Sequence, residues 1–247
     1  MSTAIKDLSE AELGEWLRKR GHPRFRLQQL REWLFRRWAV RFAEMTNLPK
    51  ALREDLGVSF CAFSLVEERS LTADDGTVKF LHRLIDGESI ESVLIPSGRR
   101  RTVCISTQVG CPVQCSFCAS GRGGLVRNLT RAEIVDQVIH ACRQGAAPVT
   151  NVVVMGIGEP LLNLAQVVPA LDLVCDPEYL GLSARHVTVS TSGIPGGIRA
   201  LAEHGRPWNL ALSLHATTDT QRAALIPSTH RAPMGEILEA CRDYRRL

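Results

Sequence analysis

Three cysteines stand close together in a loop that Gly110 and Pro112 break. Cys111, Cys115 and Cys118 are separated by three and then two residues, so their thiolates can converge on one point. Soft thiolate ligands suit iron–sulfur clusters and zinc. A structural zinc site is closed by a fourth protein ligand, and no Cys or His follows at a zinc-like spacing. Three ligands on four irons leave one iron open, so the spacing predicts a catalytic [4Fe-4S] cluster.

Three other interpretations of these cysteines stay in view. Zinc is the main alternative to the cluster, because thiolates bind it as well. A disulfide is disfavoured, because an intracellular chain keeps its thiols reduced. Buried free cysteines are common in protein cores, but three within eight residues of a Gly/Pro-broken loop are not a packing pattern.

Length and composition limit the number of domains and the class of protein. A chain of 247 residues with 45% hydrophobic residues predicts one large domain, or one domain with a smaller one. No apolar run approaches the length of a membrane helix, and the N-terminus has no signal-peptide pattern. Eight unevenly spaced cysteines without a secretory signal favour a reducing cytoplasm. The net charge of +4 is modest, so its distribution matters more than its sum.

The first sixty residues have helical patterns and a cluster of positive charge. Residues 9–12 form a capping box that opens a helix to about Arg20. A second helix is expected over 27–40, with Leu27, Leu30, Leu34 and Trp38 on one face, and a short helix after Pro49. Nine basic residues fall in this region: Arg18, Lys19, Arg20, Arg24, Arg26, Arg31, Arg36, Arg37 and Arg41. Such a stripe fits a phosphate-rich partner, and a solvated helix face explains it equally well.

The period changes to that of strands over residues 64–95. Segments 78–85 and 89–95 flank Asp86-Gly87, which is a strong hairpin signal. Strict alternation places Glu91 on the same face as Val93 and Ile95, which we expect to be the buried face. A carboxylate there either lies in water at a strand end or is placed for chemistry.

From residue 102 onward, strands and helices alternate. Strands are expected at 102–107, 151–155, 185–190 and 209–214, and helices at 130–144, 164–174 and 198–203, with more helix to the end. This alternation predicts an α/β fold with a parallel sheet, in which ligands bind at the carboxyl ends of the strands. The cysteine loop and the motifs 156–160, 190–193 and 213–215 all follow strands. The sequence therefore predicts one shared ligand site, although each motif alone could be a turn, a helix cap or a structural histidine.

The motifs together resemble one family. The resemblance rests on 109–118, 127–129, 151–163, 189–193 and 213–216, and on 25–26 and 45–50 near the N-terminus. It is the RlmN/Cfr family of radical S-adenosylmethionine (SAM) RNA methyltransferases, with the RlmN branch closer. The resemblance implies a [4Fe-4S] cluster on Cys111, Cys115 and Cys118, whose open iron is chelated by the amino and carboxylate groups of SAM.

The family's chemistry is methylation of C2 of an adenine in 23S ribosomal RNA, and in some members also in transfer RNA. One SAM methylates a cysteine, and a second SAM yields a 5′-deoxyadenosyl radical that activates this methyl group for addition to C2. A base then removes the C2 proton, and a second cysteine releases the product by forming a disulfide. The resemblance implies Glu91 as proton acceptor and Cys104 as the disulfide-forming cysteine. It also implies a set of SAM contacts: Gly158, Glu159, Ser190, Ser213, Leu214 and His215.

The resemblance also defines the expected architecture. A basic helical accessory domain at 1–62 would bind RNA, a β-hairpin and linker would cover 63–100, and a radical SAM barrel would follow at 101–247. About four of the six βα units of that barrel are present, so we expect a chain truncated at its C-terminus. The family's methyl-carrying cysteine falls in the missing part, and Cys142, Cys175 and Cys241 do not replace it. The chain alone is therefore expected to bind cluster and SAM but not to form C2-methyladenine.

Partners follow from the same resemblance. We expect a monomer that acts on 23S rRNA, and on tRNA as a second class, with an electron donor such as flavodoxin or ferredoxin and no membrane contact. Two other functions remain as hypotheses, which are a radical SAM enzyme with another substrate and a non-catalytic RNA- or ribosome-binding protein.

Overall fold

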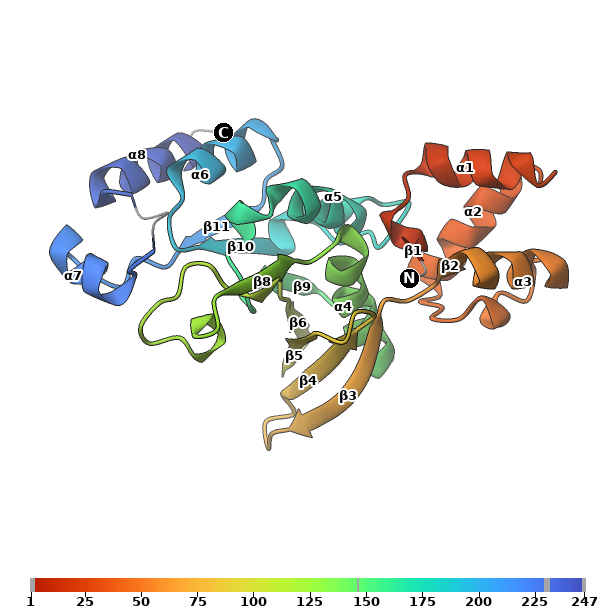
Figure 1. Ribbon diagram of the computed structural model, residues 1–247, viewed down its shortest axis with the longest axis horizontal. Helices are drawn as coiled ribbons and strands as arrows, with labels where there is room; N and C mark the ends of the chain where they lie inside the picture. Colours follow the sequence, from red (N-terminus) through yellow and green to blue (C-terminus); the bar gives the residue numbers. More distant parts are fainter. Residues whose placement is uncertain (1–2, 146, 229–231, 246–247) are drawn as a thin grey trace.

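The N-terminal helices form a lobe of their own beside a central sheet (Figure 1). The computed structural model describes residues 3–145, 147–228 and 232–245. The lobe contains α1 (Glu10–Lys19), α2 (Phe25–Arg31) and α3 (Lys50–Ser59). A two-residue parallel pair of β1 (Thr3–Ala4) and β2 (Phe60–Cys61) joins the two ends of the lobe. The predicted capping box at the start of α1 is confirmed, because Ser9 and Glu12 each accept the backbone N–H of the other.

The second helix is shorter than predicted. It begins at Phe25, becomes a π-helical turn over Glu32–Arg36 and ends there, not at residue 40. The expectation that Trp38 continues this helix is wrong, because its φ of 54° lies in the left-handed region. A single residue in that conformation interrupts a right-handed helix.

Seven strands form one mixed sheet. Their order is β11-β10-β9-β6-β5-β4-β3. The strands are β3 (Leu65–Thr72), β4 (Val78–Leu84), β5 (Ser89–Ser97), β6 (Arg100–Cys104), β9 (Asn151–Val154), β10 (Val187–Thr191) and β11 (Asn209–Leu212). The last four pair in parallel and the first three are antiparallel. The predicted α/β class is confirmed, and the hairpin strands extend the parallel sheet on its β6 side.

Helices follow the parallel strands as the alternation predicted. They are α4 (Arg131–Gln144), α5 (Leu164–Cys175), α6 (Pro195–Glu203), α7 (Asp219–Leu225) and α8 (Met234–Arg245). The predicted strands and helices of this part are all present, with ends displaced by at most three residues. Residues 246–247, which the prediction included in the last helix, lie outside the described residues. No helix in the described ranges is both long enough and apolar enough to cross a membrane.

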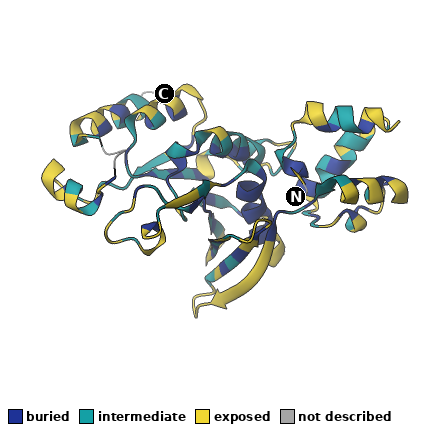
Figure 2. Cartoon of the chain, in the orientation of Figure 1, coloured by how far each residue is buried: buried dark blue, intermediate teal, exposed yellow. Residues whose placement is uncertain are grey.

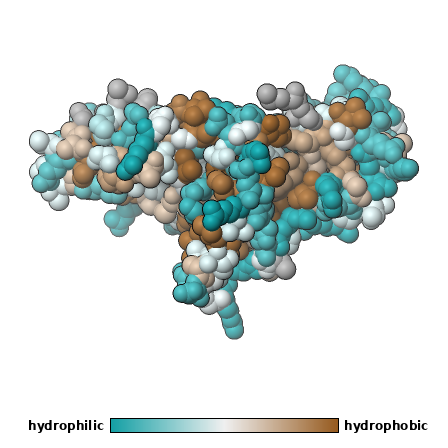
Figure 3. All heavy atoms as spheres, turned by 60° about the horizontal axis from the view of Figure 1, so that its bottom comes forward, coloured by the Kyte–Doolittle hydropathy of each residue, from teal (hydrophilic) through white to brown (hydrophobic). Residues whose placement is uncertain are grey.

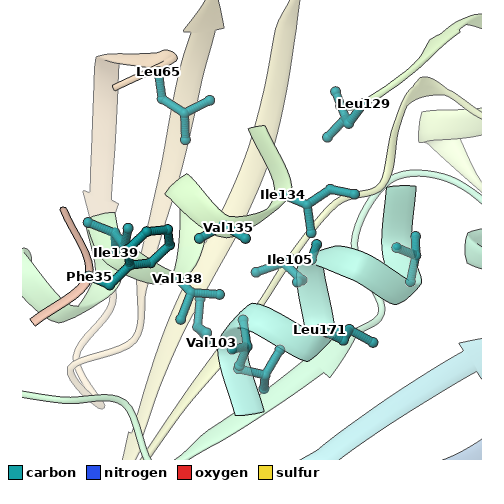
Figure 4. Close-up of a cluster of buried hydrophobic side chains, with 14 of the residues drawn as sticks. Phe35, Leu65, Val103, Ile105, Leu129, Ile134, Val135, Val138, Ile139 and Leu171 are labelled. Atoms are coloured by element: carbon teal, nitrogen blue, oxygen red, sulfur yellow. The ribbon is translucent and has the colours of Figure 1, made fainter. Parts of the chain in front are cut away.

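Helix α4 occupies the centre of the core. Val135 and Val138 approach Val103 and Ile105 of the β6 region (Figure 4), and all four side chains are fully buried. Burying such side chains contributes about 1.5–3 kcal/mol each. The same helix carries Asp136, which forms an ion pair with Lys6 of the N-terminal lobe at 2.8 Å, with both side chains 1% exposed. This buried pair fixes the lobe against the sheet.

Hydrophobic residues gather in the middle of the face seen in Figure 3, whereas its right-hand end is largely hydrophilic. Strand β3 is exposed over nearly its whole length (Figure 2). The prediction of which face of β5 is buried is wrong. Ile90, Ser92 and Leu94 are buried, whereas Glu91 is half-buried and Ile95 exposed. The reason is that α4 covers only one face of the hairpin, and this is the face opposite Glu91.

Candidate active site

A cavity of about 330 Å³ lies at the carboxyl ends of β9, β10 and β11. This volume is at the lower end of the range of small-molecule sites, and the position follows the rule for parallel α/β sheets. Its lining contains predicted site residues from all four motifs. They are Cys111, Cys115, Cys118, Gly158, Glu159, Ser190, Ser213 and His215. Residues more than a hundred positions apart thus meet in one place, as the strand-end argument predicted.

The cysteine loop is closed at its base by a short antiparallel ladder of β7 (Gln108–Gly110) and β8 (Leu125–Asn128). Gly110 is required in this ladder, because its φ is 71° and a Cβ would lie 2.0 Å from the carbonyl oxygen of Gly124. On its far side, the loop is attached to α7, since the Ser116 N–H donates to the Leu225 carbonyl at 2.9 Å. The loop is therefore supported at both ends, which pre-positions its thiols.

The three cysteines suit a cluster by ligand chemistry and placement. All three are partly buried and face the same cavity. Burial raises the pKa of the Cys111 and Cys115 thiols, and coordination to a metal overcomes this by deprotonating the thiol. In the described ranges, no three His, Cys, Asp or Glu side chains are arranged to hold a single metal ion. A four-iron cluster spreads its thiolates over different irons, so it needs a wider spacing than a single ion does.

The turn after β9 approaches the preceding strand closely. A Cβ on Gly156 would lie 2.7 Å from the Ile105 carbonyl group, and one on Gly158 2.8 Å from the Thr107 hydroxyl. Gly158 also has a φ of 112°, which side chains disfavour. The turn therefore needs glycine at both positions, and its backbone forms one wall of the cavity.

Glu159 is 3% exposed, and its carboxylate binds groups within the protein. One oxygen accepts the Leu161 N–H at 3.1 Å, and the other accepts the N–H and hydroxyl of Ser192 at 2.7 and 2.8 Å. The Glu159 N–H donates to the Gln108 side chain at 2.8 Å. The Glu159 side chain therefore connects the turns after β9 and β10 and orders the wall of the cavity.

Three further residues complete the wall at the ends of β10 and β11. The hydroxyls of Ser190 and Ser213 lie 3.4 Å apart. His215 has a φ of 61°, a conformation that is rare without glycine and is concentrated at functional sites. Its ring lies 4.7 Å from that of Phe117 in the cysteine loop. Leu214, which the resemblance implies as a SAM contact, is not among the residues that line the cavity.

Glu91 and Cys104 lie on adjacent strands outside the cavity lining. The β5–β6 register pairs Val93 with Cys104, so Glu91 is the diagonal neighbour of Cys104 on the same face. The Glu91 carboxylate pairs with Lys79 at 2.7 Å. Burial raises the pKa of the Cys104 thiol, while a hydrogen bond from the backbone of Met155, a cavity residue, opposes this. The two predicted catalytic groups are thus brought together beside the cavity, and their roles stay predictions.

Sequence reasoning missed several residues of the cavity. Phe117 and Ser192 lie within quoted motifs, so their positions could have been found from the strand-end rule. Met155 could have been found as the last residue of the predicted strand. Ile226 follows α7, and no signal in the sequence relates it to the cysteines.

Comparisons with known proteins match both parts of the chain to radical SAM RNA methyltransferases. Residues 3–61 match the family described as ribosomal RNA large subunit methyltransferase N-terminal domain, and residues 105–247 match the radical SAM superfamily. The probable dual-specificity RNA methyltransferase RlmN of Thermus thermophilus is 49% identical over 225 residues, covering 89% of this chain and 63% of the relative. The corresponding protein of Synechocystis is 45% identical over 240 residues, covering 97% of this chain and 68% of the relative.

A solved structure agrees with these sequences. The crystal structure of a radical SAM methyltransferase from Sphaerobacter thermophilus matches with a TM-score of 0.93 and 44% identity, covering 98% of this chain and 72% of that chain. The chain thus spans about 63% to 68% of the length of the two named relatives.

Proposed function

Because the chain belongs to the RlmN family of the radical SAM superfamily, we propose that it serves the methylation of adenine C2 in 23S rRNA and tRNA. The superfamily's cofactors are a [4Fe-4S] cluster and SAM. When bound, they supply a 5′-deoxyadenosyl radical. The observation that carries the proposal is that three cysteines and the ends of three parallel strands line one cavity.

The cavity residues divide into two groups with different tasks. Cys111, Cys115 and Cys118 would hold three irons and leave the fourth open. The turns after β9, β10 and β11 would hold SAM, with the Gly158 backbone and the Ser190 and Ser213 hydroxyls as polar contacts. The close approach of Gly158 to Thr107 and the position of both hydroxyls in the cavity lining support this division.

The adjacent sheet face would act on the RNA base. Glu91 would accept the C2 proton, since its carboxylate faces the side of the sheet that α4 leaves open. Cys104 would form the transient disulfide that releases the product, and its half-buried thiol lies one strand away. The target adenine must leave its stack to reach these groups, as bases do in other enzymes that act on them.

The N-terminal lobe would contact the RNA backbone, with an electron donor such as flavodoxin or ferredoxin docking elsewhere. Part of the basic stripe is used internally, because Arg31 pairs with Glu10 and Glu178, and Arg37 with Glu32. The remaining exposed cations keep the lobe suited to phosphates. Residues 1–62 would thus correspond to RNA binding and residues 101–247 to radical generation, while the base chemistry would combine Glu91 of residues 63–100 with Cys104 of residues 101–247.

SAM cleavage tests the proposal directly. Cluster-loaded protein is reduced with dithionite, mixed with SAM, and assayed for 5′-deoxyadenosine with a 23S rRNA fragment or with free adenosine. We expect cleavage that Cys118→Ala abolishes and that the RNA fragment stimulates more than adenosine does. Cleavage no greater than that of the Cys118→Ala variant would contradict the radical chemistry. Equal stimulation by both additives would contradict RNA as the substrate.

A further inference from the structure

A second large cavity, of about 430 Å³, lies on the N-terminal lobe between α1 and the start of α2. The cysteine loop and the strand ends contribute nothing to it. Its floor is apolar, with Ala11, Leu17 and Leu27, and Gly14 leaves a strip of bare helix between them. The rim is polar, and its members are Glu10, Arg18, His22 and Arg24.

The charge of the rim is positive in effect. The charge of the Glu10 carboxylate is already paired, because one of its oxygens accepts from Arg31 at 3.0 Å and from the Tyr179 hydroxyl at 2.6 Å. Arg24 is exposed, and the Arg18 side chain is 72% exposed although it pairs with Glu15. An apolar floor with a cationic rim complements a group that has flat apolar faces and an attached anion.

The fold does not require glycine at position 14. A Cβ there would meet only the Leu27 side chain at 3.9 Å, which is an ordinary contact. Glycine inside a helix costs about 1 kcal/mol relative to alanine. Position 14 therefore carries a local cost in stability that packing does not explain, and its effect is to keep the groove open.

We propose that this α1–α2 groove binds one unpaired nucleotide of the RNA substrate, with the base on the Gly14 strip and its phosphate at Arg24. The proposal rests on the proposed function and adds a specific nucleotide site to it, distinct from the site of the target adenine. An unstacked base suits the groove, because proteins recognise single-stranded RNA by covering the faces of its bases. An intact duplex would keep its bases away from the floor.

Filling the groove tests the site. The probe is a fluorescein-labelled single-stranded RNA heptamer, and its affinity is measured by anisotropy. Gly14→Leu should weaken binding several-fold, because the added side chain occupies the space that the base would take on the groove floor. Gly57→Leu is the matched control, because Gly57 is a helical glycine of the same lobe whose Cβ would meet nothing within 4 Å. Both variants should fold, since each replaces glycine in a helix by a better helix former.

The phosphate contact is tested separately by the salt dependence of RNA affinity. Arg24→Gln should reduce the slope of log K against log salt by about 0.7, the value for one single-strand phosphate contact. Arg199→Gln is the control of equal charge, since Arg199 lies on α6, outside the groove and the basic stripe, and pairs with Asp243. If Gly14→Leu binds the RNA heptamer as tightly as the original chain does, the proposed nucleotide site in the groove is wrong, and the proposed function stays intact. Failure of the original chain to bind any RNA would instead count against the proposed function.

Discussion

Two hydrogen bonds of 2.7 and 2.8 Å join the Glu159 carboxylate to the N–H and hydroxyl of Ser192. They connect the turns after β9 and β10, which form neighbouring parts of the cavity wall. Family resemblance implies Glu159 as a SAM contact, but its carboxylate is already satisfied by protein donors. We therefore expect this side chain to act on SAM binding through the position of Ser192.

A double-mutant cycle separates these two roles of Glu159. Glu159→Gln replaces one of the two acceptor oxygens with an NH2 donor, so the side chain can no longer accept from both Leu161 and Ser192. SAM affinity of the cluster-loaded protein should therefore fall about tenfold, in keeping with the loss of a bond to a charged group. Ser192→Ala should weaken SAM binding less, because its backbone N–H remains. The double variant should show a coupling of at least ~1 kcal/mol. Additive losses, measured by equilibrium dialysis, would favour direct contact with SAM.

Each cluster cysteine should be indispensable for iron binding. Replacing Cys111, Cys115 or Cys118 with Ala should abolish the [4Fe-4S] content, because the loop offers no fourth thiol to take its place. Cys241→Ala is the control, since Cys241 lies on α8 and does not line the cavity. Iron and sulfide analysis after anaerobic reconstitution measures the result. A full cluster in any of the three loop variants would contradict the assignment.

We expect the ion pairs of Arg127 to be the main interaction that holds the cysteine loop against the hairpin. It pairs with Asp86 in the β4–β5 turn at 2.6 Å and with both oxygens of Glu133 at 2.8 Å. Arg127→Gln leaves the Glu133 carboxylate, which is 8% exposed, without its cation, so the free energy of unfolding should fall by about 2 kcal/mol. Asp86→Asn should cost at most about 1 kcal/mol, because that pair is more exposed. Urea denaturation of both variants gives the comparison, and equal losses would refute the ranking.

The buried histidines between β4 and α4 predict sensitivity to acid. Burial lowers the pKa of His82 to about 3, helped by the nearby His140, and burial also lowers the pKa of His140. The unfolded chain takes up protons near pH 6.5 and the folded protein does not, so stability is present above this pH and is lost as pH falls. For His82 the loss between pH 8 and pH 5 should be about 2 kcal/mol.

His82→Gln checks this origin of the acid sensitivity. Glutamine removes the titrating group, so the difference in unfolding free energy between pH 8 and pH 5 should shrink. His186→Gln, at an exposed position, should leave the difference unchanged. The histidine explanation is wrong if His82→Gln shows the original pH dependence.

The sequence predicted elements and their order better than it predicted faces and contacts. Capping boxes and strand-end motifs are local, so the helix starts and the meeting of Cys111 with Ser190 and His215 followed from short patterns. The orientation of Glu91 depended on which side of the hairpin α4 covers, and this is decided by packing between distant segments. Alternation of polar and apolar residues cannot choose between two faces when both carry aliphatic residues, here Ile90 and Leu94 on one face and Val93 and Ile95 on the other.

Two further features depended on tertiary structure. The left-handed conformation of Trp38 ends the second helix, although leucine spacing alone suggested that it continued. The hydrogen bonds by which Glu159 connects two turns form only because the ends of β9 and β10 are adjacent in the fold. Ser192 lies thirty-three positions away in the sequence. Motif reasoning placed Glu159 at the right site, and only the fold showed which atoms its carboxylate contacts.

Electron paramagnetic resonance of the anaerobically reconstituted, dithionite-reduced chain, recorded with and without SAM, tests the central claim most directly. The claim is that Cys111, Cys115 and Cys118 present an open iron to a cofactor held by the strand-end turns. A [4Fe-4S]⁺ signal that changes shape when SAM is added is the predicted result. Folded protein that binds zinc and gives no cluster signal, or a cluster signal indifferent to SAM, would contradict it.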